Sequence, residues 1–273
     1  MPEKWLINPG QSKIIDVDGI AALKVSLIGG QIDIIGHDEP MTRVEIRNVT
    51  GKDLKVTADA GRLEIDHPQL RWDNFIDVFR SWHGKAGADV SVLVPRDVAL
   101  KLGTVGGNAL VSGLVTGARL STVNGDLTAD TLVGDVELNG VSGELAVQNH
   151  LGGVKANTVS GDVTLSGTLS RVAVDGVSGN VFVDVAGVPD SIRHNTVSGD
   201  LTLRLDGGVP ARYRVNSVSG MLQVDNNVYR GAGARNFEQQ DGELDAHWVE
   251  VSANSVSGNV SVVRRAVPAQ GTV

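Results

Sequence analysis

The chain has 273 residues, a formal net charge of −8 and no cysteine. The acidic balance argues against nonspecific nucleic-acid binding, and the absence of thiols excludes disulfides and thiolate metal sites. The first residues lack the apolar core of a signal peptide and no stretch reaches 18 uninterrupted apolar residues, so we expect a cytoplasmic protein with no membrane span.

Residues 1–66 alternate apolar and polar side chains in short runs, which is the pattern of strands with one buried face. Turn residues such as Gly29 and Gly30 separate the runs. We predict an irregular β cap or the first coils of a larger stack here, because the end strand of a stack otherwise exposes unpaired backbone groups.

Residues 67–88 form an aromatic insertion with a different period. Trp72, Phe75, Phe79 and Trp82 are spaced by three, four and three residues, which places them on one face of a helix. We therefore predict one short helix. It either caps the end of the hydrophobic core or presents an aromatic patch to a partner, a second copy or a membrane surface.

Residues 89–263 repeat a motif whose fullest form is Asn-Thr-Val-Ser-Gly-Asp at 157–162. Its glycines recur at spacings of 18, 18, 18, 18, 20, 21 and 38 residues. A recurring period of this length is typical of a stacked repeat architecture. The motif glycines are Gly107, Gly125, Gly143, Gly161, Gly179, Gly199, Gly220 and Gly258.

Counted from the motif valine as the origin of each rung, apolar side chains recur at +4, +6, +10, +13 and +15. Pairs two residues apart indicate strands with one buried face. We predict an all-β parallel β-helix or β-solenoid with about 18 residues per coil. After Val159 the inward residues are Val163, Leu165, Leu169, Val172 and Val174, and the two preceding rungs place Val133 and Leu151 at +10.

The corners of the coils carry glycine and small polar residues. Glycine permits positive φ there, and we expect the Asn at the start of each motif to form a ladder along the stack. The residues after the glycine would form a column of oxygen ligands, which suits turn residues better than a calcium site because only one edge of the turn carries the acid. They are Asp126, Glu144, Asp162, Asn180, Asp200 and Asn259.

We predict one elongated domain over residues 1–273. Its solenoid spans 89–263, with outward loops near 188–190 and 207–210 and a tail over 264–273. The excursion 226–248 is either a degenerate rung with a loop or a long lid. We therefore regard it as a second candidate surface for function.

The sequence contains no motif that predicts a catalytic, cofactor or metal site. The six histidines lack paired metal spacing, and there is no phosphate-binding loop or nucleophile elbow. When the rungs are aligned with allowance for their inserted residues, His194 falls at the inward position that Val174 and Val215 occupy on other rungs, so we interpret it as an interior histidine. Outward Thr, Ser and Asn make a glycoside hydrolase or lyase a minor alternative.

The segment Val90 to Pro95, with the rungs Thr158 to Leu165 and Thr196 to Leu203, resembles the bacterial domain-of-unknown-function 4097 family of adhesin-labelled β-strand repeat proteins. The resemblance covers about Leu23 to Val263. It implies a β repeat fold and an adhesin-like role. In some members it implies a link to cell-envelope stress, in others membrane segments, and it supplies no catalytic motif.

Our first hypothesis is a non-enzymatic scaffold or interaction module that works through residues 72–82, the excursion 226–248 or a flat face of the solenoid. The alternatives are a carbohydrate-binding or carbohydrate-active β-helix protein and a self-assembling rod. We expect a protein partner or self-association, with no nucleic acid and no cofactor. Membrane-surface contact and glycan binding stay open.

Overall fold

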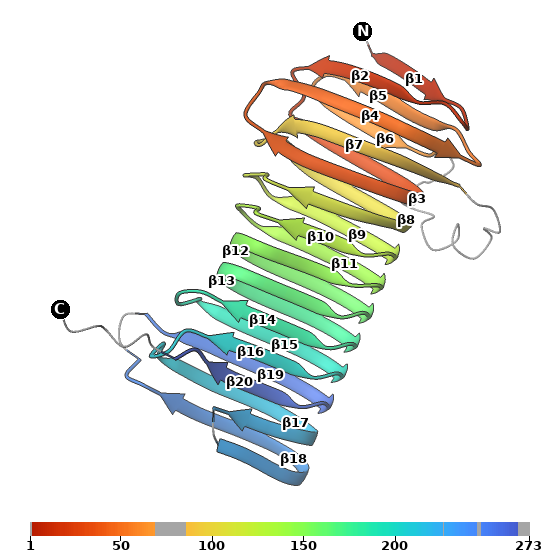
Figure 1. Ribbon diagram of the computed structural model, residues 1–273. Coiled ribbons are helices and arrows are strands. Elements are labelled where there is room, and N and C mark those ends of the chain that lie inside the picture. The colour runs from red at the N-terminus through yellow and green to blue at the C-terminus, as the bar shows by residue number, and fades with distance from the viewer. Residues whose placement is uncertain (1, 69–85, 226, 245–246, 267–273) are drawn as a thin grey trace. The chain divides into compact units, whose positions relative to one another are not determined.

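The computed structural model describes residues 2–68, 86–225, 227–244 and 247–266. All regular elements in these ranges are β-strands, which confirms the all-β prediction (Figure 1). The predicted short helix lies outside the described residues. Contacts divide the chain into two compact units, Met1–Ala146 and Val147–Val273, and we describe each by itself. The single elongated domain stays a prediction.

Unit 1 is built around two long strands, β3 and β8, that pair in parallel over most of their length. The register joins Ala22 to Ala99 at one end and Ile35 to Ser112 at the other. The strands of unit 1 are β1 (Glu3–Ile7), β2 (Lys13–Asp18), β3 (Ala22–His37), β4 (Met41–Thr50), β5 (Leu54–Asp59), β6 (Arg62–Asp66), β7 (Gly87–Pro95), β8 (Ala99–Ser112), β9 (Ala118–Asn124), β10 (Leu127–Asp130) and β11 (Val136–Ser142).

The two halves of β3 pair with different strands. The first half pairs in parallel with β6, and antiparallel β5 and β1 follow outward. The second half pairs in parallel with β7, and antiparallel β4 and β2 follow outward. On the other side, β8 pairs in parallel with β9 and β10, and β9 with β11. Antiparallel hairpins therefore flank a parallel, solenoid-like stack.

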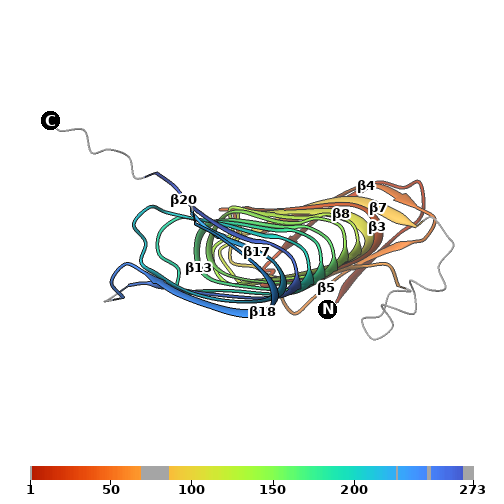
Figure 2. The same cartoon turned by 90° about the horizontal axis from the view of Figure 1, so that it is seen from below.

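Unit 2 contains strands that bend at a corner so that each half pairs with a different neighbour (Figures 1 and 2). The first half of β13 pairs with β14 and the second with β15, both in parallel. The strands are β12 (Leu145–Ser160, which begins at the end of unit 1), β13 (Val163–Ser178), β14 (Val181–Val185), β15 (Ser191–Ser198), β16 (Leu201–Leu205), β17 (Ala211–Val224), β18 (Asn227–Asp241), β19 (Val249–Ser257) and β20 (Val260–Arg264).

The parallel register of unit 2 stacks the predicted inward positions on one another. Val163 pairs with Val181, and Val172 pairs with Ile192. The +4, +6, +13 and +15 positions of the rung after Val159 are all buried, as the sequence predicts. Columns of small aliphatic side chains thus fill the core, and each column is continuous because equivalent residues lie on neighbouring strands.

The order of strands in unit 2 departs from their order in the chain. β19 lies between β15 and β17, because Asn254 pairs with Asn195 on one side and Asn216 on the other. β20 likewise pairs with β16 and with the end of β17. Most of the excursion predicted over 226–248 is the strand β18, which pairs antiparallel with β17 along its length and is therefore neither a degenerate rung of the parallel stack nor a lid.

The structure contradicts the sequence prediction at the +10 position of two rungs. Val133 and Leu151, which the sequence places inside, are 38% and 51% exposed, whereas Leu132 and His150 just before them are buried. Each buried residue directly follows a left-handed corner residue with a φ near 50°. The chain therefore turns inward one residue earlier than the hydrophobic pattern indicates. The corner residues are Thr131, with a φ of 54°, and Asn149, with a φ of 50°.

Candidate functional site

The motif valine, which served as the origin of each rung, faces outward. In unit 2 the five motif valines are between 48% and 51% exposed. The strand register places them next to one another on successive strands, and the Ser178 hydroxyl donates a hydrogen bond to the carbonyl oxygen of Val159 at one end of the row. We call this row the valine stripe: Val159, Val177, Val197, Val256 and Val218, in order along the stack.

Alternation along the strand sets the outward orientation of the stripe. Thr158, Thr196 and Ser255, which precede three of the valines, are buried, and successive strand residues point to opposite faces. The glycine two residues after each valine lets neighbouring strands approach closely. Gly199 has a φ of 134°, and a Cβ there would overlap the carbonyl oxygen of Gly179.

An amide ladder runs beside the stripe, as the sequence predicts. The side-chain amide of Asn216 donates to Asn254 Oδ1 at 2.8 Å, and that of Asn254 donates to Asn195 Oδ1 at 2.7 Å. Asn195 Nδ2 in turn donates to Asp175 Oδ1 at 2.7 Å. These bonds hold the neighbouring strands in register, so the stripe is presented by an ordered backbone.

The residues after the motif glycine bind backbone rather than standing free. Asp162 Oδ1 accepts a hydrogen bond from the Asn180 amide at 2.7 Å, and Asp200 Oδ1 accepts one from the Asn259 amide at 2.7 Å. These hydrogen bonds agree with our interpretation of the column as turn residues. Within the described ranges, no three His, Asp or Glu side chains are grouped so that they could hold a metal ion.

A shallow groove of about 250 Å³ lies at the end of the stripe. Val218 and Val256 border it together with members of the amide ladder, and Asn236 of β18 forms its outer wall. The groove therefore widens the apolar row where the antiparallel strand joins the stack. Its lining is Asn195, Thr196, Asn216, Ser217, Val218, Asn236, Asn254, Ser255 and Val256.

The equivalent position in unit 1 is mostly covered. Val105 and Val123 are buried in one apolar cluster with Ile28 and Ala86, whereas Val141 is 45% exposed. Ile28 belongs to the same column because its neighbours on β3 pair with the neighbours of Val105 on β8. The same motif position is thus buried in one part of the chain and exposed in another.

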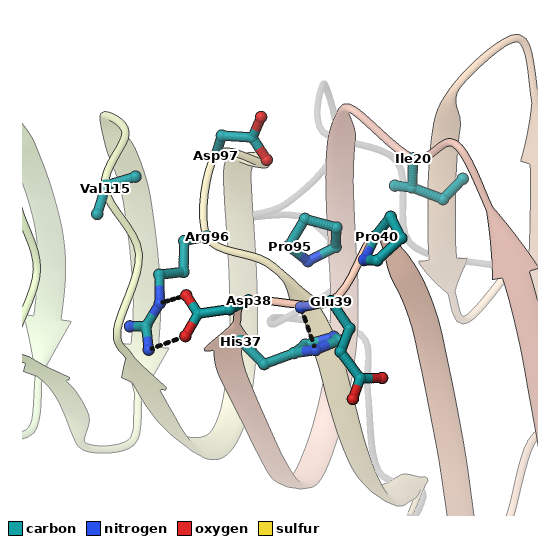
Figure 3. A pocket seen from close by; sticks show the side chains of 9 residues that line it. All are labelled: Ile20, His37, Asp38, Glu39, Pro40, Pro95, Arg96, Asp97 and Val115. Atoms are coloured by element: carbon teal, nitrogen blue, oxygen red, sulfur yellow. Dashed lines mark hydrogen bonds and ion pairs between the residues drawn. The ribbon is translucent and has the colours of Figure 1, made fainter.

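Unit 1 also has a polar hollow of about 450 Å³ between the turn after β3 and the end of β7 (Figure 3). Arg96 Nε donates to Asp38 Oδ1 at 2.5 Å and Arg96 Nη1 donates to the Gly113 carbonyl at 3.1 Å. The Arg96 hydrogen bond lowers the pKa of Asp38. Glu39 and Asp97 add two carboxylates to the lining, so its charge is predominantly negative.

The buried histidines lie in the core. His194 pairs in register with Val174 and Ala253, which confirms its predicted interior position, and desolvation lowers its pKa. Burial lowers the pKa of His67 to about 4, and His67 Nδ1 accepts a hydrogen bond from the Ile28 amide at 3.3 Å. Their environments are those of packed, neutral side chains.

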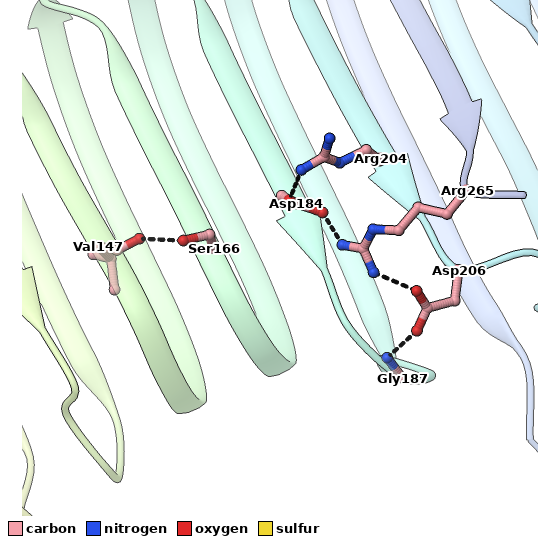
Figure 4. A network of polar contacts seen from close by, with 7 residues as sticks. All are labelled: Val147, Ser166, Asp184, Gly187, Arg204, Asp206 and Arg265. Carbon is pink, nitrogen blue, oxygen red and sulfur yellow. Dashed lines mark hydrogen bonds and ion pairs between the residues drawn. The ribbon is translucent and has the colours of Figure 1, made fainter. Parts of the chain in front are cut away.

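Two arginines, one at the end of β20 and one just after it, attach this strand to the rest of unit 2. Arg265 binds both Asp184 and Asp206, and Arg204 also binds Asp184 (Figure 4). Asp206 Oδ2 accepts a hydrogen bond from the Gly187 amide at 2.7 Å. The network therefore ties the end of the last strand to the loop after β14. Neighbouring Arg264 donates to the Tyr213 hydroxyl at 2.9 Å and pairs with Asp241 at 2.7 Å.

The interaction patch predicted from the sequence, Trp72, Phe75, Phe79 and Trp82, lies outside the described residues. The valine stripe was missed because a β-branched residue in a β repeat reads as a core residue. Its constant place two residues before a corner glycine was the available signal, since the Thr before it in 157–162 already occupies the alternating inward position.

Strands paired in parallel around small aliphatic columns define an all-β, solenoid-like protein. The chain belongs to the Toastrack DUF4097 family, whose model matches residues 20–263. A search of curated proteins finds no match. Within the described ranges no helix is long and apolar enough to cross a membrane.

Three crystal structures resemble the chain at low identity. They are a candidate cell adhesion protein from Clostridium sporogenes (14% identity, TM-score 0.30, covering 93% of this chain and 99% of that one), a candidate adhesin from Bacteroides fragilis (8%, 0.47, 94% and 100%) and a candidate lipid-binding protein from Parabacteroides distasonis (12%, 0.47, 94% and 99%). We draw no functional inference from likeness at this level.

Proposed function

We propose that this chain is a non-enzymatic, adhesin-like scaffold that binds a partner protein through the valine stripe of unit 2. In this proposal the pairs of residues 18 to 20 apart are successive coils of a β-helix. The coils act as a ruler that repeats one side chain at a fixed spacing. The stack then supplies the rigidity and the outward corner supplies the contact surface.

The observation that carries the proposal is the uniform exposure of the stripe. Single exposed apolar residues are normal on any surface, but a contiguous apolar row marks an interaction site. Here five valines have nearly the same exposure on neighbouring strands. The amide ladder beside them limits the ways in which the surface can rearrange, so a partner loses little free energy in ordering it.

Site-specific photocrosslinking in the native host tests this function. A benzophenone amino acid is placed at Val177 or Val197, and at Val188 as an off-stripe control of similar exposure. We expect a discrete crosslinked protein from the stripe positions and none from the control. Crosslinking that is absent at both stripe positions, or equal at the control, would refute binding through the stripe.

Glycan binding is a second candidate function, favoured by the hollow in unit 1. Its clustered carboxylates near a turn are groups that bind sugar hydroxyls, and Ile20 and Val115 give it apolar walls. A glycan array followed by titration calorimetry tests it. We expect an Asp97→Asn variant to lose affinity for any glycan that binds. An array without hits, or a hit that this variant retains in full, would refute the role of the hollow.

The remaining sequence-based expectations stay proposals. They are the non-enzymatic character, the cytoplasmic location and the link to cell-envelope stress that the family resemblance implies. A stress link would appear as a change in abundance of the protein when the host is treated with a cell-wall antibiotic. An unchanged abundance across such treatments would argue against it.

A further inference from the structure

The valine stripe has an uncharged centre, and carboxylates border it mainly on the side of the motif glycines. Asp175 of the amide ladder lies on one side, and Asp162 and Asp200 follow the motif glycines on the other. Lys155, Arg193 and Arg214 lie on the same outward face beyond the amide ladder, four residues before a stripe valine. The complementary partner therefore presents an apolar row with basic side chains along the edge that faces Asp162 and Asp200.

The spacing of the stripe selects the conformation of such a partner. Neighbouring strands lie about 4.8 Å apart, so five valines span roughly 19 Å. One apolar row of an α-helix advances about 5.3 Å per contact, at 3.5 residues of 1.5 Å each. An extended strand repeats the same face about every 6.6 Å and loses register after two contacts. A polyproline II helix repeats about every 9.3 Å and meets alternate valines only.

The size of the stripe argues against a second copy as its occupant. Five half-exposed valines in single file offer only a narrow row of apolar surface. A stable dimer buries about 800 Å² on each partner. A narrow row suits one helix better than the face of a globular domain, and the groove beside Val218 and Val256 gives that helix room at one end.

The same motif position is buried in unit 1. There Val105 and Val123 form one cluster with Ile28 and Ala86, which the strand register places in the same column. In unit 2 the five equivalent valines lie open in the described structure.

We propose that the valine stripe of unit 2 binds an amphipathic α-helix of about 14 residues whose apolar row is bordered by Lys or Arg. This inference rests on the proposed function and names the class of partner that the stripe would recognise. The helix lies along the stack, perpendicular to the strands. Its apolar residues sit between successive valines and its basic residues reach the flanking Asp carboxylates.

The test uses a fluorescent 16-residue peptide with Leu at the heptad a and d positions and Lys elsewhere, titrated with the full chain at physiological salt. The stripe variant is Val177→Thr/Val197→Thr/Val256→Thr, because Thr keeps the shape and strand preference of Val. The matched control is Val188→Thr/Val228→Thr/Val263→Thr, at three other exposed valines of unit 2. Thermal melting checks that both variants fold.

We expect a micromolar dissociation constant that weakens at least tenfold in the stripe variant and stays unchanged in the control. A peptide with Glu in place of Lys should bind at least tenfold more weakly than the Lys peptide. Equal affinity of the stripe and control variants would overturn the proposal, since binding would then be nonspecific attraction between charges. Self-association that the stripe variant alone loses, without peptide binding, would identify a second copy instead.

The photocrosslinking experiment separates this inference from the proposed function. A crosslinked partner whose contact peptide is a basic amphipathic helix supports both. A crosslinked partner that makes contact through another kind of segment would support the proposed function and refute the inference of a helix. The absence of any crosslinked partner at the stripe would refute the proposed function itself.

Discussion

Replacing Gly199 by alanine should destabilise unit 2 strongly, because the corner has neither the backbone freedom nor the space for a Cβ. At a φ of 134° a side chain costs about 1–3 kcal/mol in backbone strain. The Cβ would also overlap the carbonyl oxygen of Gly179 and push the two coils apart. Two inter-coil hydrogen bonds flank this point, at the amides of Asp200 and Val181, and weakening both costs about 2 kcal/mol.

The expected loss is therefore about 3–5 kcal/mol, a large share of a typical stability of about 5–15 kcal/mol. Gly187→Ala is the matched control, because Gly187 has a φ of 81° and no atom within 4 Å of an added Cβ. It should cost about 1–2 kcal/mol from backbone strain alone. Urea unfolding followed by circular dichroism measures both, and at a slope near 3 kcal/mol/M the midpoint of the Gly199 variant should lie about 1–1.7 M below that of wild type. Equal midpoints for the two variants would refute the reasoning that coil spacing depends on the corner glycine.

Three further predictions concern the amide ladder of unit 2, the buried His67 of unit 1 and the Arg265 ion pairs of unit 2. Asn254→Ala breaks two ladder hydrogen bonds and should lower the free energy of unfolding by about 1–2 kcal/mol in urea titrations. Burial lowers the pKa of His67 from 6.5 to about 4, so the unfolded chain binds a proton at this residue more strongly than the folded chain does. The free energy of unfolding should therefore fall by on the order of 3 kcal/mol as the pH drops from 6.5 to about 4. The His67→Asn variant should lack this pH-dependent loss. Arg265→Gln should cost about 1–2 kcal/mol at pH 7. Because Arg204 first and Arg265 second hold the pKa of Asp184 below 3.8, that difference should shrink as the carboxylate protonates at lower pH.

Each of these predictions has a result that would contradict it. Asn227→Ala, at an exposed position of β18, should leave stability unchanged, so an equal loss there would remove any special role for the ladder. Identical pH profiles for wild type and His67→Asn would show that His67 is not the titrating group. A stability difference for Arg265→Gln that persists undiminished at pH 2 would mean that packing, and not the contact with Asp184, is responsible.

The core residues of the parallel strands could be predicted because their signal is local. Val163 and Leu165 stand two residues apart and recur at every rung, and their register follows from the spacing of the glycines. His194 was placed correctly for the same reason, since its position in the repeat outweighs its residue type. The strands and the amide ladder could be predicted from this periodicity, whereas the family came from the resemblance of particular segments to a known one.

The stripe and the strand order could not be read in the same way. Hydrophobicity assigns Val159 and Leu151 to the core, yet alternation and a left-handed corner turn both outward. The place of β19 between β15 and β17 depends on pairings 59 and 38 residues apart, which no repeat spacing encodes. The gap of 38 residues signals an interruption but not that the chain folds back to fill a vacant layer.

Because β19 is inserted between β15 and β17, the last described strands hold the end of unit 2 together. In most repeat proteins, deleting the terminal repeat removes only the stability which that repeat contributes, because it contacts a single neighbour. Here β19 and β20 contact strands on both sides, and Arg264 and Arg265 fasten them. Truncation before β19 would separate β17 and β18 from the coils that support them. During synthesis, β17 and β18 can join the rest of unit 2 only after β19 and β20 have left the ribosome, so this part of the fold forms late.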